Sequence, residues 1–207
     1  MDKSKLAVDT YEKIAGKDAA QYFDDMVDVP YIDKFLDKLP AKAKILDVGS
    51  GPGQFAKHMI EKGFEVVGID FSQEMVAIAK NKVPSVDFHH MDMRQLDIPD
   101  NTFDGVFSAY SLIHIPSEEV YTTLQGLHRV LKAGGYIEIA VQKGEADKII
   151  DEPFMPTEKM FFNFFTEERI SKYLDEARFQ ILSQEIMAID DAETMSDKVI
   201  YTIAQKA

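Results

Sequence analysis

The chain has 207 residues, of which 45% are hydrophobic and 29% charged, a balance typical of one globular domain that buries a full core. It contains no cysteine, which excludes disulfides, zinc–thiolate sites and a cysteine nucleophile. Its formal net charge of −13 repels phosphate backbones, so no nucleic-acid partner is expected. The opening residues lack the apolar core of a signal peptide and no segment is long enough to span a membrane. We therefore expect a cytoplasmic protein with no membrane partner.

The order of apolar patterns along the chain predicts a parallel α/β sheet. The residues before about Pro40 form an amphipathic helical stretch with Leu6, Tyr11 and Ile14 among its apolar members. Beyond it, short apolar runs alternate with helical patterns, which indicates a parallel sheet with helices on both faces. Strands are expected at 43–49, 64–70, within 85–92, at 103–108 and at 136–141, and helices at 53–63, 71–82 and 116–135. Ser72 and Ser117 are suitable N-caps for two of these helices.

The C-terminal third departs from this alternation. Residues 142–165 hold two prolines, two methionines and five phenylalanines, which predicts either a loop packed on the core or a lid over a substrate. Thr166 can cap a helix over 167–177, and strands at 179–189 and 198–205 should pair antiparallel because no helix separates them. We therefore expect a single domain: an N-terminal helical cap (1–40), a cofactor-binding core (41–142), a lid-like insertion (143–166) and a C-terminal helix with antiparallel strands (167–207).

A glycine cluster follows the first predicted strand. The spacing is Gly49-x-Gly51-x-Gly53, directly after Asp47. Glycines allow a tight turn and a close approach of backbone to ligand, and the helix that follows directs free N–H groups at the site. The dinucleotide fingerprint needs a glycine where this chain has Gln54, and the Gly-Lys-Ser/Thr of a P-loop is missing. The glycine turn predicts that a nucleotide-like cofactor binds here, but it does not identify the cofactor.

Other polar residues end neighbouring strands. Asp70, Asp92 and the segment after Ser108 each follow a predicted strand, and the carboxyl ends of parallel strands meet at one rim, where ligands bind. An acid at the end of the second strand can accept both ribose hydroxyls of an adenosine. Dinucleotide enzymes and adenosylmethionine enzymes share that feature, so it does not separate them.

Four motifs in order are more specific. "DVGSGPG", "VVGIDFS", "HMDMRQLDIPDNTFDGVFSAYSLIHI" and "LKAGGYIEIAV" together resemble the class I S-adenosylmethionine-dependent methyltransferases, and most closely the small-molecule branch with type 11 and type 25 domains. The resemblance covers roughly 44–141. It implies a doubly wound, mostly parallel seven-stranded Rossmann-like sheet with an antiparallel last strand, plus an N-terminal helical cap.

The resemblance also implies cofactor contacts. Asp70 would bind the ribose hydroxyls and Asp92 the adenine amino group, while Tyr11 would close over the methionine end. The implied S-adenosylmethionine-binding residues are Tyr11, Asp47, Gly49, Gly51, Gly53, Asp70, Phe71, Asp92, Met93 and Ser108. No metal site is expected, since the adjacent histidines 89 and 90 face opposite ways in a strand.

The sequence says less about the methyl acceptor and about the residue that would remove its proton. His114 follows the fourth strand on the active rim and is the candidate general base for a hydroxyl acceptor, although a lone histidine is more often structural. The aromatic 142–165 segment favours an apolar or aromatic small molecule, and we expect a monomer or homodimer. Two alternatives stay open: a regulatory protein that binds S-adenosylmethionine with little transfer, and a nicotinamide-dependent oxidoreductase.

Overall fold

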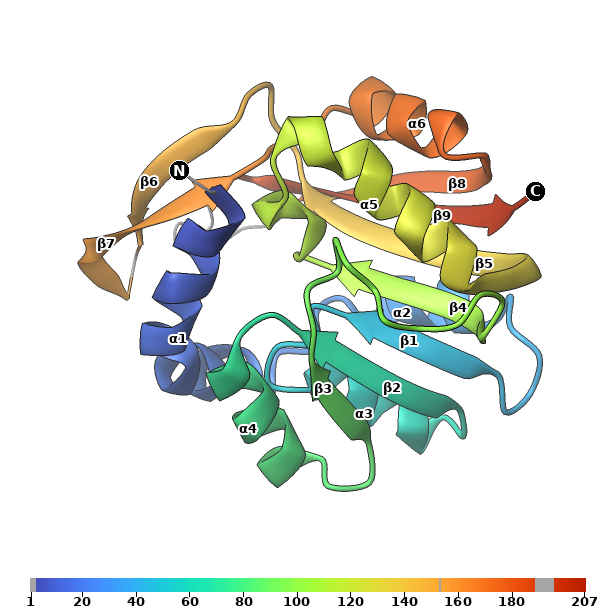
Figure 1. Ribbon diagram of the computed structural model, residues 1–207, viewed down its shortest axis with the longest axis horizontal. Coiled ribbons are helices and arrows are strands. Elements are labelled where there is room, and N and C mark those ends of the chain that lie inside the picture. Colours follow the sequence, from blue (N-terminus) through green and yellow to red (C-terminus); the bar gives the residue numbers. More distant parts are fainter. Residues whose placement is uncertain (1–2, 153, 189–195) are drawn as a thin grey trace.

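The computed structural model describes residues 3–152, 154–188 and 196–207, and these build one seven-stranded sheet with helices on both faces (Figure 1). The strand order is β3-β2-β1-β4-β5-β9-β8. Neighbouring strands from β3 to β5 are parallel, whereas β9 runs antiparallel to both β5 and β8. The expected mostly parallel sheet with an antiparallel last strand is confirmed. Its strands are β1 (Lys44–Val48), β2 (Glu65–Asp70), β3 (Asp87–His90), β4 (Phe103–Ala109), β5 (Leu131–Gln142), β8 (Phe179–Ala188) and β9 (Lys198–Lys206).

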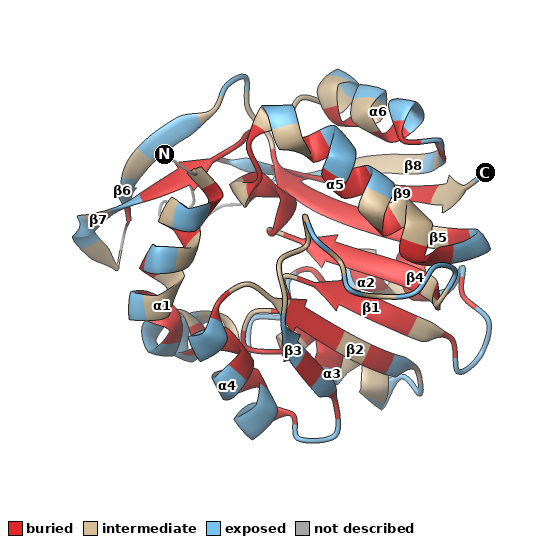
Figure 2. Ribbon diagram, in the orientation of Figure 1, coloured by how far each residue is buried: buried red, intermediate tan, exposed pale blue. Residues whose placement is uncertain are grey.

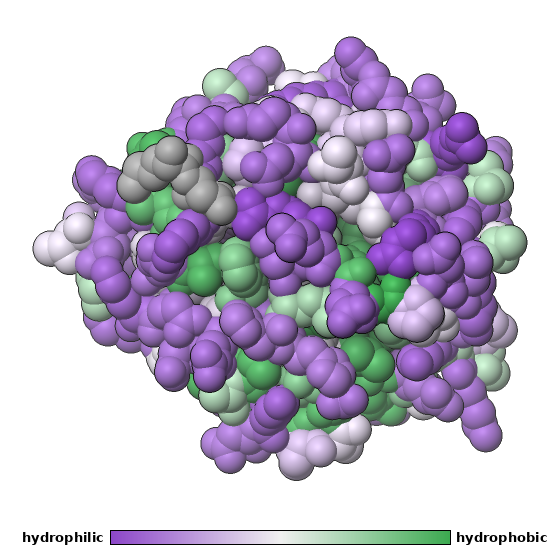
Figure 3. Space-filling view, viewed as in Figure 1, coloured by the Kyte–Doolittle hydropathy of each residue, from purple (hydrophilic) through white to green (hydrophobic). Residues whose placement is uncertain are grey.

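The central strands are buried on both faces, which is why they read as continuous apolar runs (Figure 2). In β1, Ile45 points to the face covered by α2 (Val29–Leu36), α3 (Gln54–Glu61) and α4 (Gln73–Lys82). Its neighbours Leu46 and Val48 point to the face covered by α5 (Ser117–Val130) and α6 (Glu167–Glu176). Alternation along one strand therefore supplies two separate apolar clusters. On the face shown in Figure 3, hydrophilic side chains predominate, with hydrophobic side chains visible toward the middle and lower part of the view.

Two of the three predicted helix caps are confirmed. The Ser72 hydroxyl accepts from Met75 N at 3.1 Å and the Thr166 hydroxyl from Arg169 N at 3.2 Å. The prediction for Ser117 is wrong: Pro116 occupies the N-cap position and the Ser117 hydroxyl donates to Asp147 at 3.0 Å. The helix α5 also ends before the predicted glycines, at Val130, because the next residue already enters β5 beside β4.

Two segments cover the carboxyl ends of the parallel strands. The predicted N-terminal helical region consists of α1 (Lys3–Tyr22), which lies over these strand ends, and α2, which packs on one face of the sheet. The segment expected to be either a loop packed on the core or a lid contains a hairpin, with β6 (Lys148–Glu152) paired antiparallel to β7 (Met155–Phe162). The Thr10 hydroxyl donates to Lys159 O at 2.9 Å and Lys13 pairs with Glu158 at 2.7 Å, so α1 lies against this hairpin (Figure 1). Among the described helices, none is both long and apolar enough to cross a membrane.

Candidate active site

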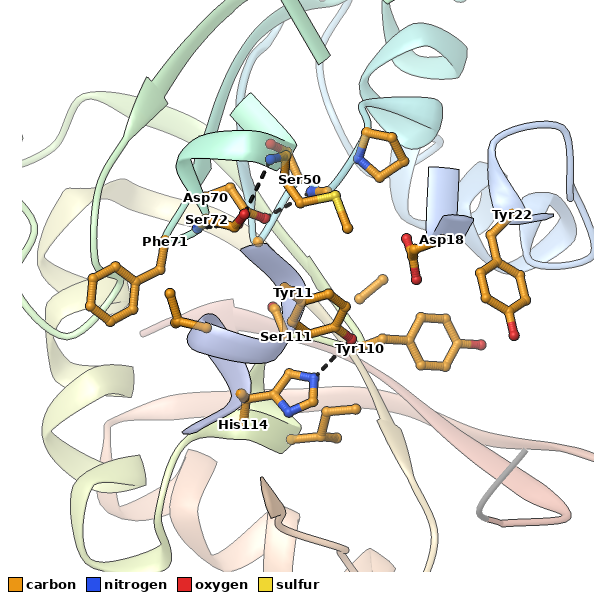
Figure 4. Close-up of a pocket in the computed structure, with 18 of the residues that line it drawn as sticks. Tyr11, Asp18, Tyr22, Ser50, Asp70, Phe71, Ser72, Tyr110, Ser111 and His114 are labelled. Carbon is orange, nitrogen blue, oxygen red and sulfur yellow. Dashed lines mark hydrogen bonds between the residues drawn. The ribbon is translucent and has the colours of Figure 1, made fainter. Parts of the chain in front are cut away.

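A cavity of about 730 Å³ lies between the carboxyl ends of the parallel strands and the covering segments. Its walls come from α1, the glycine turn after β1, the ends of β2, β3 and β4, and the β6–β7 hairpin. Its volume falls within the range of roughly 300–1,000 Å³ typical of small-molecule sites. In Figure 4, Phe71 marks one end of the cavity, and Asp18 and Tyr22 mark the other, with Tyr11 between them.

The three glycines of the turn serve three different purposes. A Cβ on Gly49 would lie 2.2 Å from Ser111 Cβ, so this position permits close packing of the segment after β4. At Gly51, where φ is +51°, a Cβ would meet nothing within 4 Å, because the backbone there faces open space in the cavity. At Gly53 a Cβ would lie 3.0 Å from the Phe88 ring, on the side of the core. Gly51 is thus the position at which backbone can approach a ligand.

Asp70 ties the glycine turn to the next helix. Gly51 N donates to its Oδ2 at 2.9 Å and Ser72 N donates to its Oδ1 at 2.8 Å. Burial raises the pKa of this carboxyl, while the two backbone hydrogen bonds oppose that shift. Each carboxylate oxygen keeps a further lone pair, and Asp70 lines the cavity, so it can accept hydroxyl donors from a bound ribose.

Asp47, Gly53 and Ser108, predicted as cofactor contacts, lie behind the cavity wall and not in it. Asp47 is 1% exposed, and its Oδ2 has no hydrogen-bond partner among the described residues. Burial, reinforced by the neighbouring Asp70, raises the pKa of Asp47 to about 8. The Ser108 hydroxyl bonds to the Ser111 hydroxyl at 2.8 Å, and Ser111 donates to Val48 O at 2.8 Å, so this pair fixes the segment after β4.

The end of the cavity marked by Phe71 carries the predicted adenine contacts. Phe71, Asp92 and Met93 line the cavity there. The Asp92 carboxylate accepts from Arg94 Nη2 at 2.7 Å and Nε at 2.9 Å, and the same guanidinium lies 5.6 Å from the centre of the Phe71 ring. The arginine was not foreseen from the sequence. It holds both the acid and the aromatic ring in position.

His114 lines the middle of the cavity beside Tyr11. Its Nδ1 lies 2.9 Å from Phe161 O, a pure acceptor, so Nδ1 carries the proton and Nε2 accepts from the Tyr11 hydroxyl at 3.2 Å. Burial lowers the pKa of His114 to about 4, and the bond to the carbonyl opposes that shift. The imidazole is therefore neutral near pH 7.

The acids Asp18, Asp28 and Glu152 also line the cavity and were not singled out from the sequence. Asp28 accepts from the Tyr110 hydroxyl at 2.8 Å and from the Tyr201 hydroxyl. One signal for Asp18 exists in the sequence, because it lies four residues after Ile14 on the apolar stripe of a helix, where an acid is unusual. Asp28 is the N-cap residue of α2 and Glu152 ends β6, and only the tertiary fold brings them to the cavity.

The inserted antiparallel strand, the glycine turn and the acid ending β2 together define a Rossmann-like domain that binds a nucleotide cofactor at the carboxyl ends of its strands.

Comparison with known proteins identifies the family within this class. A methyltransferase domain family matches residues 45–135. A phosphatidylethanolamine N-methyltransferase of Cereibacter sphaeroides is 30% identical over 165 residues, which cover 77% of each protein. The chain belongs to the class I S-adenosylmethionine-dependent methyltransferases, and the expectation from its motifs is confirmed.

Other relatives agree with this family. A demethylmenaquinone methyltransferase of Chlorobaculum parvum is 37% identical over 93 residues, 44% of this chain and 38% of that protein. The structure of a Burkholderia thailandensis 1,6-didemethyltoxoflavin-N1-methyltransferase, solved with its substrate and S-adenosylhomocysteine, has a TM-score of 0.78 at 19% identity and covers 99% of this chain and 88% of that one. The matched region spans 38% to 52% of the length of the first curated relatives. The nicotinamide-dependent alternative does not fit this family.

The residues present fit the cofactor of the family. The open backbone at Gly51 leaves room for a ligand, and Asp70 presents a carboxylate to the same space. The Asp47 carboxyl, directly before that turn, has a buried oxygen, Oδ2, with no hydrogen-bond partner among the described residues. The site thus supplies acceptors for a cofactor that carries a cationic sulfur and an amino group.

Proposed function

We propose that this protein transfers a methyl group from S-adenosylmethionine to a small-molecule acceptor. The observation that carries the proposal is the covered cavity: it begins at Gly51 and Asp70, and it continues beneath α1 to a second end at Asp18 and Tyr22. The first end suits the cofactor, and the second leaves space for another molecule. A cover formed by a helix and a hairpin admits a small molecule more readily than a macromolecule.

The chemistry asks little of the protein beyond positioning. When bound, S-adenosylmethionine supplies a methyl group on a cationic sulfur that leaves as a neutral thioether. Asp70 would hold the ribose, Phe71 and Met93 would lie against the adenine, and Asp92 would accept its amino group. The turn at Gly51 would carry the methionine portion, with Asp47 behind it. Alignment of two reactants in a site that excludes water is the main contribution expected from this chain.

We further propose that His114 positions Tyr11 and does not serve as the base. A group with a pKa of about 4 accepts protons weakly near neutrality, and the Nε2 lone pair already accepts from Tyr11. The Tyr11 ring stands edge-on to the imidazole, with centroids 5.3 Å apart. This contact would hold α1 over the reacting groups.

The acceptor end is lined by aromatic and apolar side chains, which supports an apolar or aromatic acceptor. Tyr22 and Phe154 meet edge to face with centroids 6.0 Å apart, and Phe162 lies beyond His114. Two similar proteins are named as methyltransferases of demethylmenaquinone and 1,6-didemethyltoxoflavin, and a third as a phosphatidylethanolamine N-methyltransferase. The first two names support a small-molecule acceptor for the present chain.

Binding and turnover test the proposal separately. S-adenosylhomocysteine at 100 times its Kd should raise the free energy of unfolding by about 2.7 kcal/mol, whereas NADH should leave the melting temperature unchanged. Release of labelled methyl groups to a panel of small acceptors then tests transfer. Stabilisation without transfer to any acceptor would support the regulatory, binding-only alternative.

A further inference from the structure

Among the described residues, the Asp, Glu, Lys and Arg side chains that line the cavity are all acidic. Six acidic side chains line the cavity, from Asp18, Asp25, Asp28, Asp70, Asp92 and Glu152, and no Lys or Arg is among the described residues that line it. Arg94 pairs with Asp92 from outside the cavity and offsets the charge of that one acid. Asp70 and Asp92 lie at the end assigned to the cofactor, whereas Asp18 lies beside Tyr22 and Tyr110 at the other end (Figure 4). An acceptor with a carboxylate or phosphate would therefore enter a field of like charge.

Asp18 differs from the other five acids. Each of the others accepts at least one hydrogen bond: Val27 N donates to Asp25, Tyr110 to Asp28 and Met155 N to Glu152, while Asp70 and Asp92 are bonded as described above. Within the described residues, Asp18 has no hydrogen-bond or ion-pair partner, although its side chain is half-buried in the cavity wall. Buried polar groups are normally hydrogen-bonded, and this carboxylate has no donor.

A ligand that donates hydrogen bonds would supply the donor that Asp18 lacks. Asp18 lines the cavity beside Tyr22 (Figure 4), so a molecule bound at that end can reach its carboxylate.

We propose that the methyl acceptor is an amine on an apolar or aromatic body, and that its nitrogen binds against Asp18. This inference rests on the proposed methyltransferase function and names its substrate class. The aromatic faces of Tyr22 and Phe154 beside the acid suit a cation, which the ring quadrupole attracts. The apolar side chains of Val8, Ile14 and Met187, which also line the cavity, suit the body of the molecule.

Asp18 also has the right basicity for the proton that such a reaction releases. An ammonium nitrogen has no lone pair, so one N–H proton passes to the Asp18 carboxylate before the nitrogen forms its bond to the methyl carbon. The carbon–sulfur bond breaks at the same time, and its electron pair stays on sulfur. Burial, together with the charges of Asp70 and Glu152, raises the pKa of Asp18 to about 7, where a carboxylate is an effective base at neutral pH.

The test compares amines with alcohols of the same carbon skeleton on the full chain saturated with S-adenosylhomocysteine. The pairs are phenethylamine with 2-phenylethanol, hexylamine with 1-hexanol, and cyclohexylmethylamine with cyclohexylmethanol, measured by titration calorimetry. We expect at least one amine to bind tenfold or more tightly than its alcohol. Asp18→Asn should abolish that preference, leave the affinity for the alcohol within twofold, and leave the affinity for S-adenosylhomocysteine within twofold.

Asp9→Asn is the matched control, because it removes one acid from the same helix at an exposed position paired with Lys5, and it should change none of these affinities. No amine binding better than its alcohol would overturn the inference, as would an equal loss of amine and alcohol binding in Asp18→Asn. Alcohols methylated in preference to amines would overturn the inference and leave the methyltransferase proposal standing. Failure of the wild-type chain to bind S-adenosylhomocysteine would overturn both.

Discussion

The Tyr11 hydroxyl donates to His114 Nε2 across 3.2 Å, and this bond joins helix α1 to the 3-10 turn after β4 (Leu112–His114). The other imidazole nitrogen donates to Phe161 O in β7 at 2.9 Å. One neutral histidine thus connects three chain segments that are far apart in the sequence and meet over the cavity. Because both of its ring nitrogens are hydrogen-bonded, the imidazole is held in one orientation.

If His114 positions Tyr11, then Tyr11→Phe and His114→Ala should lower kcat/KM by similar factors, and the double variant should be little worse than either. The shared hydrogen bond predicts a coupling of about 1 kcal/mol. The dependence of kcat on pH should keep its shape in all three variants. Additive losses, or disappearance of one limb of the pH profile in His114→Ala alone, would restore the histidine as a base. Unchanged turnover in His114→Ala would remove it from the reaction altogether.

Gly51 and Gly53 form a matched pair, since both adopt positive φ and only one faces the cavity. Alanine at either position costs about 1–2 kcal/mol of stability through backbone strain. Gly51→Ala should in addition weaken S-adenosylhomocysteine binding by tenfold or more, because its methyl group occupies ligand space. In Gly53→Ala the added methyl group contacts the Phe88 ring. This variant should therefore have a lower melting temperature than Gly51→Ala, and its affinity for S-adenosylhomocysteine should change less. Calorimetric titration and thermal unfolding measure the two effects; equal affinities would place the cofactor elsewhere.

Asp70→Asn tests the predicted ribose contact. The amide has a single acceptor oxygen, so either Gly51 N or Ser72 N loses its partner and faces an NH₂ group. We expect a loss of ten- to a hundredfold in affinity for S-adenosylhomocysteine. Wild-type affinity should also fall as the pH drops through the raised pKa of this carboxyl, and the variant should lack that dependence. A variant that binds with wild-type affinity would exclude Asp70 from the cofactor site.

Asp47 predicts how stability depends on pH. Its folded pKa of about 8 exceeds the unfolded value near 4, so the folded chain keeps a proton that the unfolded chain releases. The free energy of unfolding should therefore decrease as the pH rises from about 4 toward 8, with a contribution from this group of at most about 1.4 kcal/mol per pH unit. Denaturant unfolding between pH 5 and pH 9 should show a shallower decrease in Asp47→Asn. Parallel curves for the two proteins would contradict the assignment.

The sheet could be predicted from the sequence because local patterns carry it. Strands buried on both faces produce apolar runs such as Ile45–Val48, and the glycine turn and the acid Asp70 occur at defined ends of those runs. The caps at Ser72 and Thr166 are likewise local hydrogen bonds, within three residues of the capping side chain. The cap at Ser117 was mispredicted because its hydroxyl found a distant partner in Asp147.

What the tertiary structure decided is the composition of the cavity. The aromatic segment after β5 is a hairpin, a pairing between residues whose local pattern shows no clear alternation. Asp18 in α1 and Glu152 in β6 are far apart in the sequence and both line the cavity. Arg94 holds Asp92 through an ion pair that spacing alone does not predict. The sequence by itself therefore determined the fold class and the cofactor, whose motifs are contiguous. The acceptor end depended on packing between distant segments, because no short motif records which side chains meet there.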